Sequence, residues 1–160
     1  MEITILQQNI VWSDPEANRK KADEAINRNP GADLYVLPEM FSTGFCTQPE
    51  GIAESTESDT LAWMKGKARA IDAAIAGSIA VTQDGKYYNR FYFVKPDGEV
   101  TWYDKKHLFT YGGEHKRFTA GSERVVVEWR GVRILLEVCY DLRFPVWARN
   151  RGDYDMILYV

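Results

Sequence analysis

The sequence contains few of the residues that build disulfide frameworks and metal centres. Only two cysteines and two histidines occur in 160 residues, and the positions of Cys46, Cys139, His107 and His115 match no zinc-ligand spacing. Two scattered cysteines do not form a disulfide framework, so a reducing cytoplasm is the expected location. We expect neither a metal nor another cofactor.

The sequence also lacks an excess of positive charge and any long apolar run. Its 20 Lys and Arg against 23 Asp and Glu give a net charge of −3, which argues against a partner bound through nucleic-acid phosphates. No apolar run approaches the length that crosses a bilayer, and residues 1–10 lack the basic start and cleavage site of a signal peptide. We therefore expect no nucleic-acid partner and no membrane partner.

What is present is the composition of an ordinary globular domain, with 45% hydrophobic and 27% charged residues. Apolar runs that predict strands alternate with capped amphipathic segments that predict helices. Helices are predicted from residue 14 to about 27, from about 58 to 71 and from 145 to 150; strands are predicted over 3–10, 34–37, 73–81, 87–94, 100–105, 125–129, 132–138 and 154–160. This alternation predicts a layered α/β fold with its ligands at the carboxyl ends of the strands.

Residues 1–160 are interpreted as a single domain, because no linker, repeat or low-complexity tract divides them. The sequence stops inside the apolar run 154–160, whereas a domain terminus is usually polar. We therefore expect the domain to be truncated at the C-terminus, with the rest of the sheet outside this chain.

Cys139 stands where an apolar strand gives way to a sharp turn and a helix predicted to begin near Pro145. The positive end of a helix dipole and free backbone N–H groups favour a thiolate, which is the reactive form of cysteine. A lone cysteine in a strand is more often an inert core residue. The turn therefore favours a nucleophile only if other reactive groups lie nearby.

Two further polar residues stand at the ends of predicted strands. Glu39 follows the strand 34–37, and Lys105 ends the strand 100–105. A thiolate attacks a carbonyl or nitrile carbon, a carboxylate accepts its proton, and an ammonium stabilises the resulting oxyanion. The backbone N–H of Tyr140 would be a second oxyanion donor. The three side chains together predict acyl transfer through a thioester.

Three segments that contain these residues resemble the nitrilase superfamily of carbon–nitrogen hydrolases. They are LPEMFSTGF around Glu39, YDKKHLF around Lys105 and VCYDLRFPVWARN around Cys139. The resemblance implies a four-layer α-β-β-α sandwich, of which this chain contains only the N-terminal portion. It also implies that glutamate is the base, lysine the oxyanion stabiliser and cysteine the nucleophile. Glu114, in YGGEHKRFTAG, matches a second family glutamate that positions the substrate and the lysine.

Within the superfamily the segments CYDLRFPVWARN and GGEHKRFTAG resemble the omega-amidase branch. That resemblance implies hydrolysis of the terminal amide of 2-oxoglutaramate or a similar dicarboxylic monoamide, with release of ammonia, by a homodimer. Arg143 or Lys116 would neutralise the substrate carboxylate, and Arg143 has a structural ion pair as its alternative. Other functions left open are a carbamoylase, a nitrilase, a deaminated-glutathione amidase, a non-catalytic scaffold and a redox thiol protein.

Three nearby residues receive other interpretations. His107 is expected to hold the lysine loop by a hydrogen bond rather than to act as a base, and Cys46 is expected to be a bystander near the pocket. Glu137 precedes Cys139 by two positions in a strand, so both side chains point to the same side. A carboxylate there would raise the pKa of the thiol unless it were paired or turned away.

Overall fold

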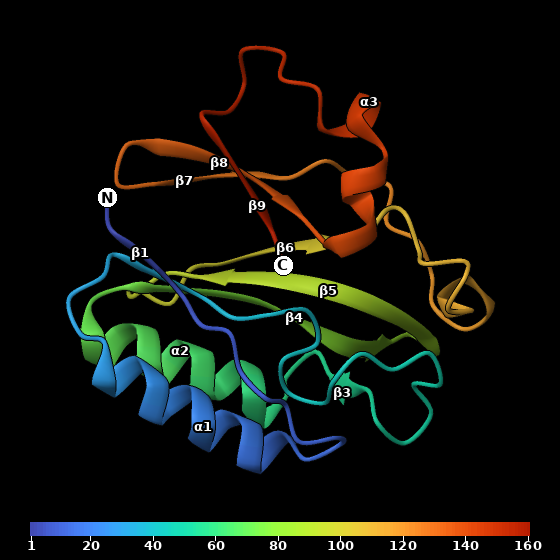
Figure 1. The fold of residues 1–160 in the computed structure, drawn as a ribbon, viewed down its shortest axis with the longest axis horizontal. Helices are drawn as coiled ribbons and strands as arrows, with labels where there is room; N and C mark the ends of the chain where they lie inside the picture. Colours follow the sequence, from blue (N-terminus) through green and yellow to red (C-terminus); the bar gives the residue numbers. More distant parts are fainter.

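The computed structural model describes all 160 residues and contains two β-sheets packed face to face (Figure 1). The larger sheet has the strand order β1-β2-β4-β5-β6, with β3 paired to β4 outside this path. Its strands are β1 (Ile3–Ile5), β2 (Leu34–Val36), β3 (Glu54–Ser55), β4 (Ala74–Gln83), β5 (Lys86–Val94) and β6 (Val100–Asp104). The smaller sheet has the order β7-β8-β9, formed by β7 (Val126–Trp129), β8 (Val132–Glu137) and β9 (Met156–Tyr159).

The directions of the strands bring the C-terminal ends of β2 and β6 to the same end of the larger sheet. Strands β1, β2 and β4 are parallel, and β5 and β6 continue the sheet in antiparallel fashion. Two reversals make β6 run in the same direction as β2, so the segments after β2 and β6 leave the sheet at the same edge. The residues that follow these two strands can therefore meet.

Two helices cover the outer face of the larger sheet (Figure 1). Helix α1 (Pro15–Arg28) begins after Asp14, whose side chain accepts a hydrogen bond from the Ala17 N–H at 3.0 Å. Helix α2 (Asp59–Ile71) begins after Ser58, which caps it in the same way. Ala22 and Ile26 of α1 are buried and Ala25 is partly buried, whereas the rest of the helix is mostly polar.

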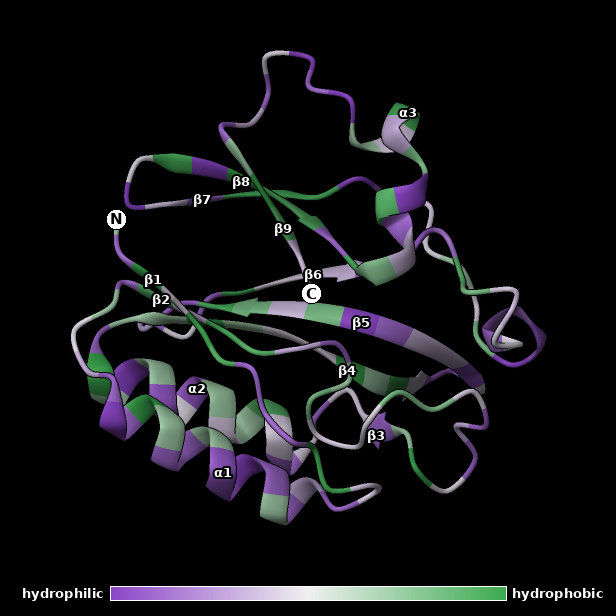
Figure 2. Ribbon diagram, viewed as in Figure 1, coloured by the Kyte–Doolittle hydropathy of each residue, from purple (hydrophilic) through white to green (hydrophobic).

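The core has two parts, one on each face of the larger sheet. In Figure 2 both α1 and α2 contain hydrophilic and hydrophobic residues, as expected of helices that cover a sheet with one face. Residues 74–81 of β4 are all buried, as expected of a strand covered on both sides. Ile75 and Ile79 pack toward the helices, and Ala74 and Ala76 pack toward the smaller sheet. Small residues on the second face let the two sheets approach each other.

The mixed α/β fold and most of the predicted elements are confirmed, with three corrections. Strand β1 ends at Ile5 rather than at residue 10; Leu6 still donates to the Val36 carbonyl, and the polar residues Gln7, Gln8 and Asn9 come after it. The short strand β3 was not predicted, since two residues carry no periodicity. The helix that begins at Pro145 is α3 (Pro145–Ala148), only four residues long, because Arg149 adopts an extended backbone.

No helix of the structure is both long and apolar enough to span a bilayer.

Candidate active site

Lys105, the residue directly after β6, lies between two carboxylates. Its Nζ is 2.8 Å from Glu39 Oε1 and 3.0 Å from Glu114 Oε2. The side chains of Lys105 and Glu114 are fully buried, whereas Glu39 is partly exposed. Burial alone would lower the pKa of Lys105, but the negative charges of the two carboxylates outweigh it and raise this pKa. The lysine is therefore held as an ammonium.

Backbone contacts and a glycine hold the Glu39 loop against β4. The Met40 N–H donates to Ser78 Oγ at 2.9 Å, and the Phe41 N–H donates to the Ser78 carbonyl. A Cβ at Gly77 would lie 2.8 Å from the Leu37 Cβ, closer than two carbon atoms can approach without movement. The glycine therefore lets the chain after β2 cross the sheet at contact distance.

Lys105 is fixed by backbone bonds on both of its sides. Its N–H donates to the Asn89 carbonyl at 2.9 Å, and its carbonyl accepts from the Gly121 N–H at 3.0 Å. A Cβ at Gly121 would lie 2.0 Å from the Asp104 carbonyl oxygen, so only glycine fits there. These bonds tie the end of β6 to β5 and to the segment that follows Glu114.

Cys139 begins the 3-10 turn η2 (Cys139–Arg143), directly after β8. Its φ of 42° is in the left-handed region that residues other than glycine rarely adopt. Its N–H donates to the Val160 carbonyl at 2.8 Å. This strained turn presents the thiol at the surface of a cavity rather than inside the sheet.

The expectation of a thiolate held by a helix dipole is wrong. The α-helix near Cys139 is the four-residue α3, which begins six positions later. Partial burial and then the negative charge of Glu39 raise the pKa of the Cys139 thiol to about 11. In the resting site the sulfur therefore carries its proton, and the neighbouring carboxylate is the group available to remove it.

The Cys139 turn is held by a buried aspartate that the sequence interpretation did not single out. Asp141 accepts hydrogen bonds from the Val138 N–H at 3.0 Å, from Tyr103 Oη at 2.8 Å and from the His107 N–H at 2.8 Å. His107 Nδ1 is also 2.8 Å from the same carboxylate, and its ring stacks on Phe144 at 3.8 Å. The expected hydrogen-bonding role of His107 in the lysine loop is confirmed.

A cavity of about 380 Å³ brings the candidate residues to a common surface. Its lining is mostly aromatic and apolar, with two charged groups and one thiol: Glu39, Phe45, Phe109, Cys139, Tyr140, Leu142 and Arg143. Lys105 and Glu114 lie behind this lining and contact Glu39 or each other. The six residues expected to form the catalytic site and its substrate support thus lie at this cavity or directly behind it: Glu39, Lys105, Glu114, Cys139, Tyr140 and Arg143.

Arg143 and Lys116, the two cations considered for a substrate carboxylate, differ in position. Arg143 lines the cavity, whereas Lys116 is exposed in the turn η1 (Glu114–Lys116) and outside the lining. Arg143 takes part in none of the ion pairs of the structure. Within residues 1–160 Arg143 is therefore not held by a carboxylate, and its role toward a substrate stays a prediction.

Cys46 and Glu137 lie near the site but outside the cavity lining. Cys46 is buried with its Sγ 3.8 Å from Met40 Sδ, so it is not exposed beside Cys139. Burial, and then the charge of Asp141, raise the pKa of Glu137 to about 8. Glu137 is therefore mostly protonated at neutral pH, which explains why an acidic residue is tolerated two positions before the thiol.

Asn89 is a contact residue that the sequence interpretation missed. It is buried in β5 and donates to both Glu39 and Glu114. The signal available was a polar residue inside the aromatic strand KYYNRFYFV, but a single asparagine in a strand indicates no particular partner.

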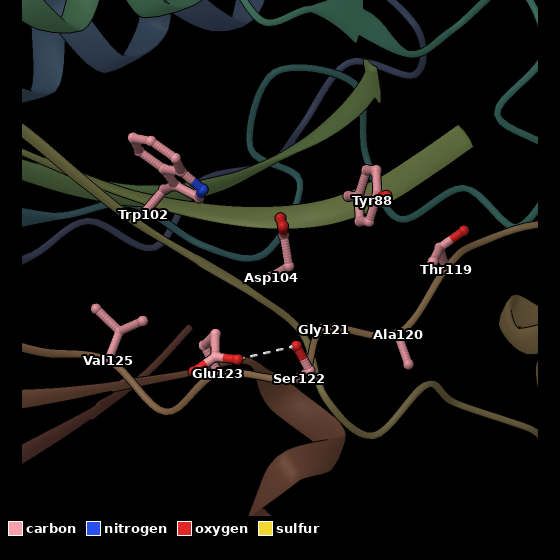
Figure 3. A pocket seen from close by; sticks show the side chains of 9 residues that line it. All are labelled: Tyr88, Trp102, Asp104, Thr119, Ala120, Gly121, Ser122, Glu123 and Val125. Atoms are coloured by element: carbon pink, nitrogen blue, oxygen red, sulfur yellow. Dashed lines mark hydrogen bonds between the residues drawn. The ribbon is translucent and has the colours of Figure 1, made fainter. Parts of the chain in front are cut away.

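A second hollow, of about 270 Å³, lies against β5 and β6 away from the thiol (Figure 3). Tyr88, Trp102 and Asp104 form one side of it, and residues 119–123 with Val125 form the other. Asp104 is already bound by Arg90, at 2.7 and 2.9 Å. This hollow contains no cysteine and neither of the carboxylates that contact the Lys105 ammonium.

Comparison with known proteins agrees with this geometry. The carbon-nitrogen hydrolase family model matches residues 2–159. The omega-amidase YafV of Escherichia coli K12 is 50% identical over the whole chain, which covers 62% of that protein. The 2-oxoglutaramate amidase of Bacillus subtilis is 36% identical over 92% of the chain, covering 59% of that protein. The chain thus spans about 60% of the length of these relatives.

Solved structures give the same result. XC1258 from Xanthomonas campestris, a CN-hydrolase superfamily protein with an arsenic adduct in its active site, superposes with a TM-score of 0.96 at 41% identity. The match covers 99% of this chain and 63% of that one. An amidase from Nesterenkonia sp. AN1, with acrylamide added to its active-site cysteine, gives a TM-score of 0.88 at 27% identity and covers 99% and 66% of the two chains. By sequence and by structure, this chain belongs to the carbon-nitrogen hydrolase family of the nitrilase superfamily.

Proposed function

We propose that the full-length protein is an omega-amidase that hydrolyses the terminal amide of a small 2-oxo or dicarboxylic acid monoamide. The observation that carries the proposal is the arrangement of Cys139 and Glu39 on one cavity wall, with the buried Lys105 bound to Glu39. The proposal is supported by the names of two relatives, an omega-amidase and a 2-oxoglutaramate amidase.

The reaction begins with a proton transfer, because the thiol is protonated at rest. Glu39 takes the proton as the sulfur of Cys139 attacks the amide carbon. The amide oxygen becomes an oxyanion, which the ammonium of Lys105 and the backbone N–H of Tyr140 stabilise. The carbon–nitrogen bond then breaks, the nitrogen takes the proton from Glu39, and ammonia leaves behind a thioester.

In the hydrolysis of the thioester, water is the nucleophile and the sulfur of Cys139 is the leaving group. Glu39 takes a proton from water, and the hydroxide attacks the thioester carbon. The second oxyanion is stabilised by the same groups as the first. When it collapses, the carbon–sulfur bond breaks and the sulfur recovers a proton from Glu39. The product is the carboxylic acid, and the site returns to its starting state.

The cavity suits a short substrate with a charged end. Its volume of about 380 Å³ accommodates a small molecule, and Phe45, Phe109 and Tyr140 form walls for an aliphatic chain. Arg143, which has no carboxylate partner in the chain, would bind the carboxylate of the substrate bidentately. A substrate panel of 2-oxoglutaramate, succinamate, carbamoyl amino acids and nitriles would define the specificity.

The test is ammonia release from 2-oxoglutaramate by the full-length protein. Cys139→Ala should abolish release, because no other nucleophile lines the cavity. Cys46→Ala is the matched control and should retain activity, because this thiol is buried against Met40. Retention of most activity by Cys139→Ala would refute the assignment.

We also propose that the protein is a cytoplasmic homodimer. Leu142, Phe144 and Val146 are exposed apolar residues in neighbouring turns of η2 and α3, and such a patch favours association. Two free cysteines are compatible with a reducing compartment. Light scattering tests the dimer, and Val146→Glu should shift it toward the monomer; an unchanged mass would exclude this patch from the interface.

A further inference from the structure

Asn89 bonds to both carboxylates of the site through one amide nitrogen. Its Nδ2 donates to Glu39 Oε1 at 2.8 Å and to Glu114 Oε1 at 3.0 Å. We infer that Asn89 is a positioning residue that makes Glu39, and not Glu114, the proton acceptor of the reaction. This inference rests on the amide hydrolysis proposed above.

The hydrogen bonds distinguish the two carboxylates. Both oxygens of Glu114 are occupied: Oε1 by Asn89, and Oε2 by Lys105 Nζ at 3.0 Å and by the Phe109 N–H at 2.6 Å. On Glu39 the two donors converge on one atom, since Oε1 accepts from Asn89 and from Lys105 Nζ at 2.8 Å. Oε2 of Glu39 therefore remains the acceptor on the side of the cavity.

Asn89 is itself held rigidly enough to impose this choice. It is fully buried in β5, where it pairs with Ala80 of β4. Its backbone carbonyl accepts from the Lys105 N–H at 2.9 Å. The side chain and the main chain of one residue thus fix the two carboxylates and the lysine relative to one another.

Charge explains why an amide suits this position. The charged and titratable groups around Glu39 are Lys105, Glu114, the thiol of Cys139 and, exposed in the same cavity lining, Arg143. One ammonium balances only one of the two carboxylates, so a net negative charge remains in a mostly buried cluster. The amide hydrogens of Asn89 stabilise this excess charge without adding a group that competes for the proton.

The test compares Asn89→Asp and Asn89→Ala in the full-length protein. Asn89→Asp keeps the shape, removes the donor and adds a third carboxylate, so the acid limb of the kcat/KM profile should move up by about one pH unit. Asn89→Ala should lower kcat by about 10–100-fold through misplacement of the base, and KM should change less than about threefold, because Asn89 does not line the cavity.

Asn18→Ala is the matched control. Asn18 is also a buried asparagine whose Nδ2 donates two hydrogen bonds, to the carbonyls of Val11 and Ser42. Its loss should lower the thermal stability comparably and leave the pH profile in place. An acid limb unmoved in Asn89→Asp, or activity losses in all three variants that simply follow their stability, would overturn the inference.

A second measurement separates this inference from the proposed activity. Alkylation of Cys139 by iodoacetamide, followed by mass spectrometry as the pH is varied, needs no amide substrate. Its rate should show an inflection at acid pH, and Asn89→Asp should move that inflection to higher pH. If wild type releases no ammonia, the omega-amidase proposal fails, and the alkylation profile alone then supports or overturns the role of Asn89.

Discussion

Replacing Glu137 by glutamine should stabilise the protein increasingly as the pH rises. Glu137 is fully buried at the end of β8, and neither of its carboxyl oxygens has a hydrogen-bond partner. Burial and then the charge of Asp141 raise its pKa from 4.5 to about 8. Glutamine has nearly the same shape without the charge, so the variant retains the packing and loses the titration.

The direction of this pH dependence follows from the pKa values of Glu137 in the unfolded and in the folded protein. The unfolded chain releases the proton of Glu137 near pH 4.5, and the folded protein releases it near pH 8. Between these values the folded state binds more protons, so the free energy of unfolding falls as the pH rises. The contribution of Glu137 is fully present below pH 4.5 and is lost by about pH 8. The whole effect is about 5 kcal/mol at 1.36 kcal/mol per pKa unit.

Urea unfolding of the full-length wild type and of Glu137→Gln measures this effect. The variant should gain about 3 kcal/mol in the free energy of unfolding relative to wild type between about pH 5 and pH 8. Glu24→Gln, at an exposed position of α1, is the control and should show a constant difference. A constant difference for Glu137→Gln would refute the reasoning, because it would mean that the folded protein does not hold this proton.

Three further predictions concern the site. Lys105→Met should lower kcat about 10²–10³-fold and destabilise the fold, because Glu114 would lose its buried ionic partner; steady-state kinetics within tenfold of wild type would contradict this. Glu39→Gln should abolish turnover and yet move thiolate formation at Cys139 to lower pH, since the charge of Glu39 helps to raise that pKa; an ultraviolet titration of the thiolate that stays at the wild-type pH would contradict this. Asp141→Asn should lower the unfolding free energy by about 1–3 kcal/mol, because an amide cannot accept all four of the hydrogen bonds made there; an unchanged melting temperature would exclude this role.

The sequence predicted the members of the site better than their protonation states. Glu39, Lys105 and Cys139 follow strand ends, and strand ends are readable from local patterns. The pKa of Cys139 depends on how deeply the sulfur is buried and on the charge of Glu39, which are properties of residues far apart in sequence. The expected helix dipole was a local argument, and it failed because α3 is too short and too distant.

Asn89 and Asp141 show what a linear pattern leaves out. Each is a single polar residue in an otherwise ordinary segment, and the role of each depends on hydrogen-bond partners on other elements. Asn89 contacts groups that follow β2 and lie in η1, and Asp141 joins the end of β6 to the turn after β8. Such partners become neighbours only when the two sheets pack.

The sequence by itself determined the alternation of strands and helices, the helix caps and the reactive residue types, because these depend on periodicity and on contacts within a few residues. The tertiary structure alone decided which oxygen of Glu39 stays free, that the thiol of Cys139 keeps its proton and that Glu137 is neutral. Each of these depends on burial and on charges from other segments, and electrostatic interactions in a folded protein are set by distance in space rather than by distance along the chain.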